Sequence, residues 1–131
     1  MKDLMENILD IAKLKKVTYA DIRVVRRQSE EIEVKNGNIE ALTRDEDFGC
    51  GIRVLHRGTW GFAASSKVDK KEMEKTFERA WKISREGSRI QVDRTSFPPA
   101  PPVVASYQTP ISVNPFQVSL ETKFRLLLEA A

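Results

Sequence analysis

The sequence predicts an α+β fold: an N-terminal helix, an antiparallel meander of four to five strands covered by a helix, a proline-rich extended segment and a C-terminal helix. Three observations support it. Apolar residues recur at helical spacing over residues 3–16, alternate with polar residues over 19–66, and return to helical spacing over 70–86. The composition then shifts, so we expect residues 1–87 to form one domain and 88–131 to form the extended segment and the start of a further helix.

The first helix is expected over residues 3–16, where Leu4, Ile8 and Ala12 fall on one face. Asp3 and Glu6 have the spacing of a capping box. We therefore expect this helix to pack on the sheet that follows.

The strands are predicted from a period of two and from turn residues. They are expected over residues 20–25, 31–35, 38–44, 50–56 and 60–64. Asn36-Gly37 between alternating runs is a strong hairpin signal, because both residues tolerate positive φ. Arg57-Gly58 predicts another tight turn, and Asp45-Glu46-Asp47 is expected to form a polar turn.

A second helix, over residues 70–86, is expected to cover the apolar face of the sheet. Its stripe consists of Met73, Phe77, Ala80, Trp81 and Ser84. Asp69 with Glu72 forms a capping box and Gly87 is a stop signal. Trp81 and Trp60 are expected to be core residues.

The tail after Gly87 is predicted to be extended, because the run Phe97-Pro-Pro-Ala-Pro-Pro102 favours polyproline II. Ser119 is expected to cap a final helix whose apolar stripe has no stop signal before Ala131. We expect the polypeptide to continue, with a catalytic domain outside this chain.

Composition favours a globular cytoplasmic domain. The net charge is +3, but basic and acidic residues are interspersed, which argues against nucleic acid as a partner. No apolar run is long enough to span a bilayer, and no signal peptide is recognisable. A single cysteine, Cys50, permits no internal disulfide, which fits a reducing compartment.

Candidate reactive residues do not combine into a site. Cys50 and His56 would lie roughly 20 Å apart on one strand, beyond the reach of a catalytic dyad. Three consecutive acids at Asp45–Asp47 cannot easily converge on one cation, and one His with one Cys is too few for catalytic zinc. Gly49-Cys50-Gly51 lacks the third glycine of a dinucleotide-binding loop and is expected to mark a bulge or a close backbone approach. We therefore expect no catalytic and no metal-binding residue in this chain.

Four ordered segments carry a family resemblance. They are Tyr19-Ala20-Asp21-Ile22-Arg23, Val34-Lys35-Asn36-Gly37-Asn38-Ile39-Glu40, Asp47-Phe48-Gly49-Cys50-Gly51-Ile52-Arg53-Val54 and Trp60-Gly61-Phe62-Ala63-Ala64. With Asn114-Pro115-Phe116 downstream, the chain resembles the N-terminal region of the TldD/PmbA family of metallopeptidases, the modulators of DNA gyrase. Gly51–Leu55 together with Gly58–Ala64 looks closer to the TldD branch than to its PmbA-type partner.

The resemblance implies a cytoplasmic zinc peptidase whose His-Glu-x-x-x-His motif lies in a C-terminal domain. No His-Glu pair occurs here, so no metal or catalytic residue is carried over. It also implies a homodimer or heterodimer that cleaves unfolded peptides. We expect this domain to serve assembly and substrate access without performing catalysis. The alternatives are a stand-alone peptide-binding or regulatory module, or the same domain of a metal-free PmbA-type partner subunit.

Overall fold

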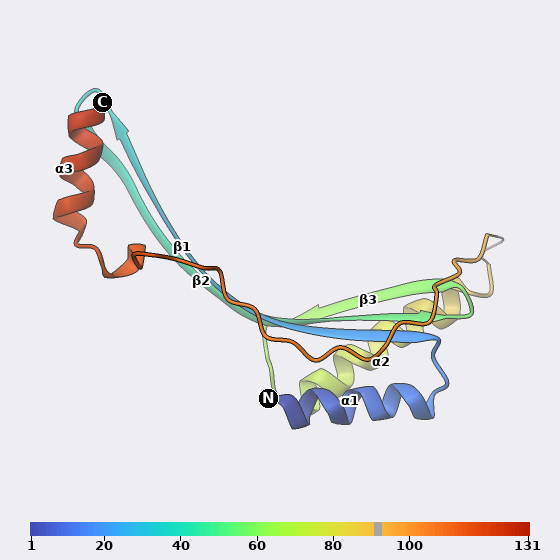
Figure 1. Cartoon of the computed structure of the whole chain (residues 1–131). Coiled ribbons are helices and arrows are strands. Elements are labelled where there is room, and N and C mark those ends of the chain that lie inside the picture. The colour runs from blue at the N-terminus through green and yellow to red at the C-terminus, as the bar shows by residue number, and fades with distance from the viewer. Residues whose placement is uncertain (91–92) are drawn as a thin grey trace. The chain divides into compact units, whose positions relative to one another are not determined.

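The structure, a computed structural model, describes residues 1–90 and 93–131 and confirms an α+β architecture (Figure 1). Its elements are α1 (Lys2–Leu14), β1 (Tyr19–Lys35), β2 (Asn38–His56), β3 (Thr59–Ser65), α2 (Lys70–Gly87), a 3-10 turn (Pro115–Gln117) and α3 (Leu120–Ala130). The strands form one sheet in the order β1-β2-β3, and β2 pairs with β3 in antiparallel register from Cys50↔Ser65 to His56↔Thr59.

The sheet has three strands where four to five were predicted, because β1 and β2 are long. β1 has 17 residues and β2 has 19, so each joins two of the predicted pieces. The predicted turn at Asp45-Glu46-Asp47 is wrong, since these residues continue β2. Their charges can stay in a strand because every residue of β2 from 38 to 48 is exposed, on both faces, and Glu46 accepts a hydrogen bond from the Gln28 amide at 3.5 Å.

Both predicted tight turns are confirmed. Asn36 and Gly37 have φ of 50° and 73°, and Arg57 and Gly58 have φ of 51° and 81°. This left-handed backbone at two successive positions matches the twist of the strands it joins.

The chain divides into two compact units, which are described separately. Unit 1 comprises residues 1–27 and 47–100, and unit 2 comprises residues 28–46 and 101–131. β1 and β2 contribute residues to both units. The predicted domain division at Gly87 stays a prediction.

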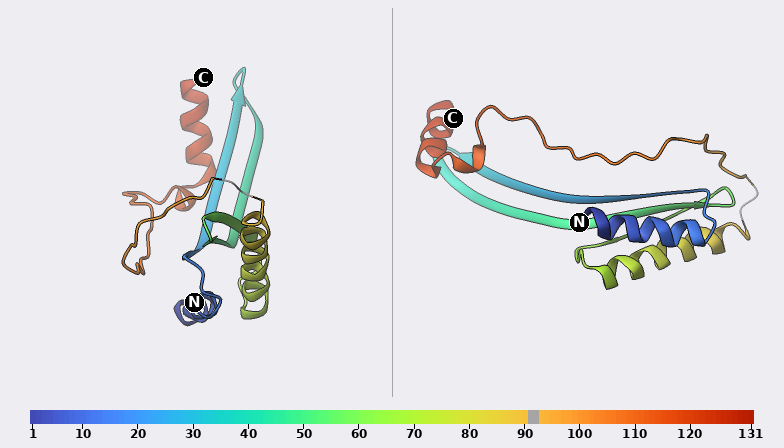
Figure 2. Two further views of the ribbon diagram at one scale, coloured as in Figure 1. Left: turned by 90° about the vertical axis from the view of Figure 1, so that its right-hand side faces the viewer. Right: turned by 60° about the horizontal axis from the view of Figure 1, so that its bottom comes forward.

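The core of unit 1 lies between one face of the sheet and the two helices. It consists of Ile8 and Ala12 from α1, Cys50, Ile52 and Val54 from β2, and Met73, Phe77 and Ala80 from α2. Both helices lie on the same side of the strands (Figure 2). The predicted cover by residues 70–86 is therefore confirmed, and α1 shares that role.

Helix α2 packs closely on β3. A Cβ at Gly61 would overlap the carbonyl oxygen of Ala80, so only glycine permits this approach. The buried Ser84 hydroxyl donates to the Thr59 carbonyl at 2.7 Å, which satisfies both groups. At the start of α2, the Asp69 carboxylate accepts from the Glu72 N–H, as predicted.

The predicted capping box at Asp3 and Glu6 is wrong. Helix α1 begins at Lys2 with Met1 as its N-cap and has no side-chain capping bond. Asp3 therefore lies inside the first turn, where its negative charge interacts favourably with the positive end of the helix dipole.

Unit 2 contains the charged ends of β1 and β2, the exposed segment from Pro101 onward and α3. Ser119 caps α3 through the Thr122 N–H at 3.2 Å, which confirms that prediction. The Lys123 ammonium and the Arg44 guanidinium both bind the Glu30 carboxylate, which holds the pKa of Glu30 below its ordinary value. No helix in the described part of the chain is long and apolar enough to cross a membrane.

Candidate functional site

The candidate site lies in unit 1, on the face of the sheet opposite the two helices. Because side chains alternate along a strand, the neighbours of the core residues point to this second face. We call it the open face; it carries Tyr19, Asp21, Arg23, Gly51, Arg53, Trp60 and Phe62.

An ion pair joins β1 to β2 on the open face. Two nitrogens of the Arg53 guanidinium, Nε and one terminal nitrogen, lie 2.8 and 2.6 Å from one Asp21 carboxylate oxygen. The hydrogen bond to Asp21 raises the pKa of Arg53, so the guanidinium stays charged. Asp21 retains only 19% of its side-chain exposure, whereas Arg53 retains 43% and can meet a ligand.

An aromatic cluster stands beside this ion pair. The ring centroids of Tyr19 and Trp60 are 5.8 Å apart at 78°, and Phe97 lies 4.7 Å from Tyr19 and 5.8 Å from Trp60. Such edge-to-face contacts are favourable beyond the area they bury. The Arg53 guanidinium carbon lies 5.4 Å from the Trp60 ring, so one side chain links the cluster to the ion pair.

A shallow cleft continues from Arg53 across the sheet. It is lined by Asp21, Arg23, Gly51, Arg53 and Phe62. Phe62 is 57% exposed, and a Cβ at Gly51 would come within 3.1 Å of its ring, so glycine keeps this space open. Arginine and aromatic side chains of this kind favour binding rather than proton transfer.

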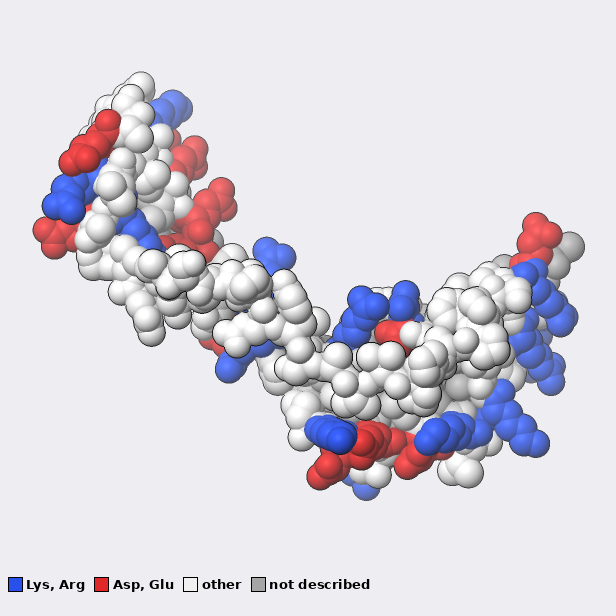
Figure 3. All heavy atoms as spheres, viewed as in Figure 1, with Lys and Arg blue, Asp and Glu red and all other residues white. Residues whose placement is uncertain are grey.

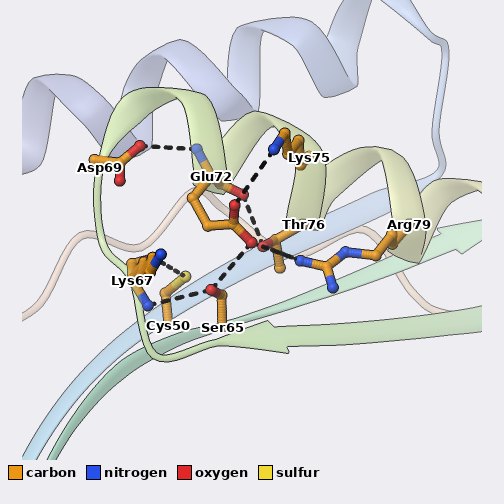
Figure 4. A network of polar contacts seen from close by, with 8 residues as sticks. All are labelled: Cys50, Ser65, Lys67, Asp69, Glu72, Lys75, Thr76 and Arg79. Carbon is orange, nitrogen blue, oxygen red and sulfur yellow. Dashed lines mark hydrogen bonds and ion pairs between the residues drawn. The ribbon is translucent and has the colours of Figure 1, made fainter.

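A polar network on the helix side of the sheet fixes the start of α2 (Figure 4). The Glu72 carboxylate accepts from Arg79 at 2.9 Å and from the Ser65 hydroxyl at 3.3 Å. The Ser65 hydroxyl in turn accepts from the Lys67 N–H at 3.2 Å. These contacts join β3 to α2 and hold structure rather than offer a reactive group.

The sequence-based candidates are dispersed. Cys50 is buried in the core, where desolvation raises the pKa of its thiol and leaves it a poor nucleophile. His56 is half-buried on the same strand, and its buried Nδ1 has no hydrogen-bond partner among residues 1–90 and 93–131. A Cβ at Gly49 would come within 2.7 Å of the Ser65 carbonyl oxygen, which confirms a close backbone approach there. Among the described residues, no group of three or more His, Cys, Asp or Glu side chains could hold a metal ion.

The two tryptophans differ from the expectation that both are core residues. Trp81 packs against the core, with the Lys15 ammonium 3.9 Å and the Arg85 guanidinium carbon 4.5 Å from its ring centres. Trp60 lies on the open face and is half-buried. Sequence reasoning missed the cluster around Trp60, although the odd-numbered residues of β1, Tyr19, Asp21 and Arg23, already pointed away from the apolar face.

The surface charge is mixed, as predicted. Acidic and basic side chains both occur over the face drawn in Figure 3.

The amino-acid sequence is similar to those of known metalloproteases. Residues 20–84 match the family model described as PmbA/TldA metallopeptidase domain 1. The chain is 29% identical over 126 residues to metalloprotease MJ0996 of Methanocaldococcus jannaschii, covering 95% of this chain and 28% of that relative. It is 27% identical over 106 residues to metalloprotease slr0863 of a Synechocystis species, covering 80% of this chain and 22% of the relative.

Two solved structures share the fold. The Thermotoga maritima protein TM0727, named as a modulator of a DNA gyrase, superposes with a TM-score of 0.72 at 19% identity over 98% of this chain and 28% of its own. TldE from Thermococcus kodakarensis has a TM-score of 0.61 at 17% identity over 82% of this chain and 23% of its own. The chain thus spans between 22% and 28% of the length of each of these relatives.

Proposed function

The chain belongs to the TldD/PmbA family of metallopeptidases, and on that premise we propose that it is the non-catalytic N-terminal domain of a longer, zinc-dependent peptidase acting on unfolded peptides. Its role is to guide extended peptides and to support assembly with a second family member. We propose a cytoplasmic location and no role for nucleic acid.

One observation supports the proposal: the open face offers a contact surface, while the described residues do not form a catalytic metal site. The residues of this chain do not fit a zinc site, because its one thiol is buried in the core and its one imidazole lies six residues further along the same strand. The open face instead presents the Asp21–Arg53 pair, aromatic rings and a shallow cleft. This arrangement supports binding here and hydrolysis by residues encoded elsewhere.

Peptidase assays test the division of labour. The 131-residue chain, incubated with a chemically unfolded protein and zinc, is expected to produce no new fragments. Cleavage by this chain that a chelator abolishes would overturn the proposal. The reading frame beyond Ala131 is expected to encode His-Glu-x-x-x-His; its absence would favour a PmbA-type subunit and contradict the TldD-type preference.

A paired variant tests the guiding role in the longer protein. Replacing both members of the pair, Asp21→Asn with Arg53→Gln, removes both partly buried charges together. It leaves without its partner only Arg23, which lies 3.6 Å from Asp21 and is 72% exposed. We expect KM for an unfolded peptide to rise several-fold with metal content unchanged. The matched control is Arg89→Gln, which removes an exposed arginine paired with Glu86 on the helix side and should leave KM unchanged.

A further inference from the structure

We propose that the Tyr19–Trp60 pair and the adjoining cleft form a binding site for an aromatic side chain of an extended peptide, and that Phe97 occupies this site in the free chain. The proposal rests on the proposed function, because it names the class of peptide that the open face would take. In the free chain the proline-rich segment would cover the site through Phe97, and a bound peptide would displace Phe97 from it.

Phe97 is less exposed than the large apolar residues that follow it as far as Tyr107. It is 39% exposed, whereas Val103, Val104 and Tyr107 are 79%, 71% and 84% exposed. Its ring contacts both Tyr19 and Trp60, but more than a third of its surface still faces solvent. Phe97 is therefore docked by one side chain, without being enclosed.

The backbone around Phe97 can leave the sheet at little cost. The Thr95 N–H donates to the Gly58 carbonyl at 2.8 Å, which fixes the chain two residues before Phe97. After Phe97 the sequence is Pro-Pro-Ala-Pro-Pro, and prolines have no N–H to contribute to a strand ladder. Release of Phe97 breaks ring contacts and leaves the ladder between β2 and β3 intact.

The occupant of the site defines the ligand that fits it. Phe97 is an aromatic residue followed by prolines in extended conformation, docked on a tyrosine and a tryptophan. Aromatic-lined grooves of this kind bind pre-extended peptides, which lose little entropy on docking. Arg53 then connects the pair to the cleft at Phe62, where a neighbouring side chain of the peptide would lie.

Because Phe97 is attached to the chain beside the site, the proposal predicts the direction in which peptide affinity changes when Phe97 is removed. A side chain held two residues from its anchor competes at an effective concentration on the order of millimolar, so a free peptide meets a site already filled. Removing Phe97 should therefore strengthen peptide binding. A purely structural role for Phe97 predicts the opposite, because loss of a packing residue would loosen the open face.

The test measures binding of a labelled peptide to the 131-residue chain by fluorescence anisotropy. The probe is Ser-Phe-Pro-Pro-Ala-Pro-Pro, the sequence of residues 96–102, and the control probe replaces its Phe with Ala. We expect Phe97→Ala to bind the Phe probe about tenfold more tightly than the unaltered chain, equivalent to about 1.4 kcal/mol. It should gain nothing for the Ala probe.

Two further variants keep the result decisive. Phe116→Ala removes a phenylalanine of the same 39% exposure from unit 2 and should bind as the unaltered chain does. Phe97→Leu, which keeps an apolar side chain on the rings, should show a smaller gain of the same sign, and it decides the question if Phe97→Ala fails to fold. Unchanged or weaker binding by the folded variants overturns the proposal.

Failure of this inference can be told from failure of the proposed function. The anisotropy assay measures binding without cleavage. If Phe97→Ala gains affinity while the longer protein has no metal-dependent peptidase activity, the site stands and the peptidase role falls. If the longer protein is an active peptidase but Phe97→Ala does not gain affinity, the proposed role of Phe97 falls and the peptidase role stands.

Discussion

Nine apolar residues are buried in the described part of unit 1, whereas none of the residues of unit 2, all of which the structure describes, is buried. Unit 1 therefore gains its stability from apolar surface removed from water. Unit 2 relies on apolar side chains that stay partly in contact with solvent, such as Ile39, Phe124 and Leu128 around one surface cleft, and on the ion pairs of Glu30. The comparison teaches that α2 and α3 should respond to mutation, salt and pH in different ways.

The largest expected effect comes from Phe77→Ala. Phe77 is fully buried, and truncating a buried phenylalanine costs about 3–5 kcal/mol. Denaturant unfolding followed by far-ultraviolet circular dichroism should show this loss for unit 1. The matched change in unit 2, Phe124→Ala, should cost much less, because Phe124 is only half-buried. Equal losses would break the comparison.

Gly61→Ala should have the next largest effect. The added methyl group would meet the Ala80 carbonyl and the Ser84 N–H, which are backbone atoms that cannot turn aside. Overpacking of this kind typically costs about 1–3 kcal/mol. The midpoint of denaturant unfolding should fall. Ala64→Ser, at an exposed position of the same strand, serves as the control and should leave the midpoint unchanged.

The two helix caps offer a like-for-like test of the units. Asp69→Ala and Ser119→Ala each remove a side-chain acceptor from an N-terminal N–H, at a cost of about 1 kcal/mol. Amide hydrogen exchange should show a different distribution of that cost. In the first variant, protection should fall throughout α2 and the core strands; in the second, it should fall in α3 alone. Equal spread in both variants would count against separate stabilities.

The smallest effect is expected from pH, and in unit 2 it acts through Glu30. Since the pKa of Glu30 is lowered in the folded chain, its contribution is fully present above the ordinary glutamate pKa and is lost as pH falls through the lowered value. Helix α2 is no silent reference, because Arg85 and Arg89 lower the pKa of Glu86 there as well. For Glu30, the amide chemical shifts around Lys123 in α3 should change on acidification below about pH 4. Glu30→Gln should abolish that pH dependence; a dependence that persists in this variant would assign it to another group.

Much of the secondary structure could be predicted from the sequence, because its signals are local and consistent. The hairpin at Asn36-Gly37, the Asp69 cap and the apolar stripe of α2 each depend on residues close in sequence. The strand count was wrong because charged residues at Asp45–Asp47 resemble a turn, while their partners on β1 lie far away in the sequence.

The open face could be predicted only in part. The alternation at Tyr19, Asp21 and Arg23 shows that these residues share a face, but it does not show what they contact. Arg53 is 32 residues from Asp21, and Phe97 reaches Tyr19 from beyond α2. Such pairings depend on how the chain returns to the sheet, which local periodicity does not encode.

The buried thiol of Cys50 can report how often the core of unit 1 opens to solvent. As the only cysteine, it can react with an alkylating reagent at a single place, and burial keeps the thiol protonated and out of reach in the closed state. Alkylation then proceeds only as fast as the core opens to solvent. The rate at which mass spectrometry detects the single alkylated product would give the rate of core opening in unit 1, without any engineered label.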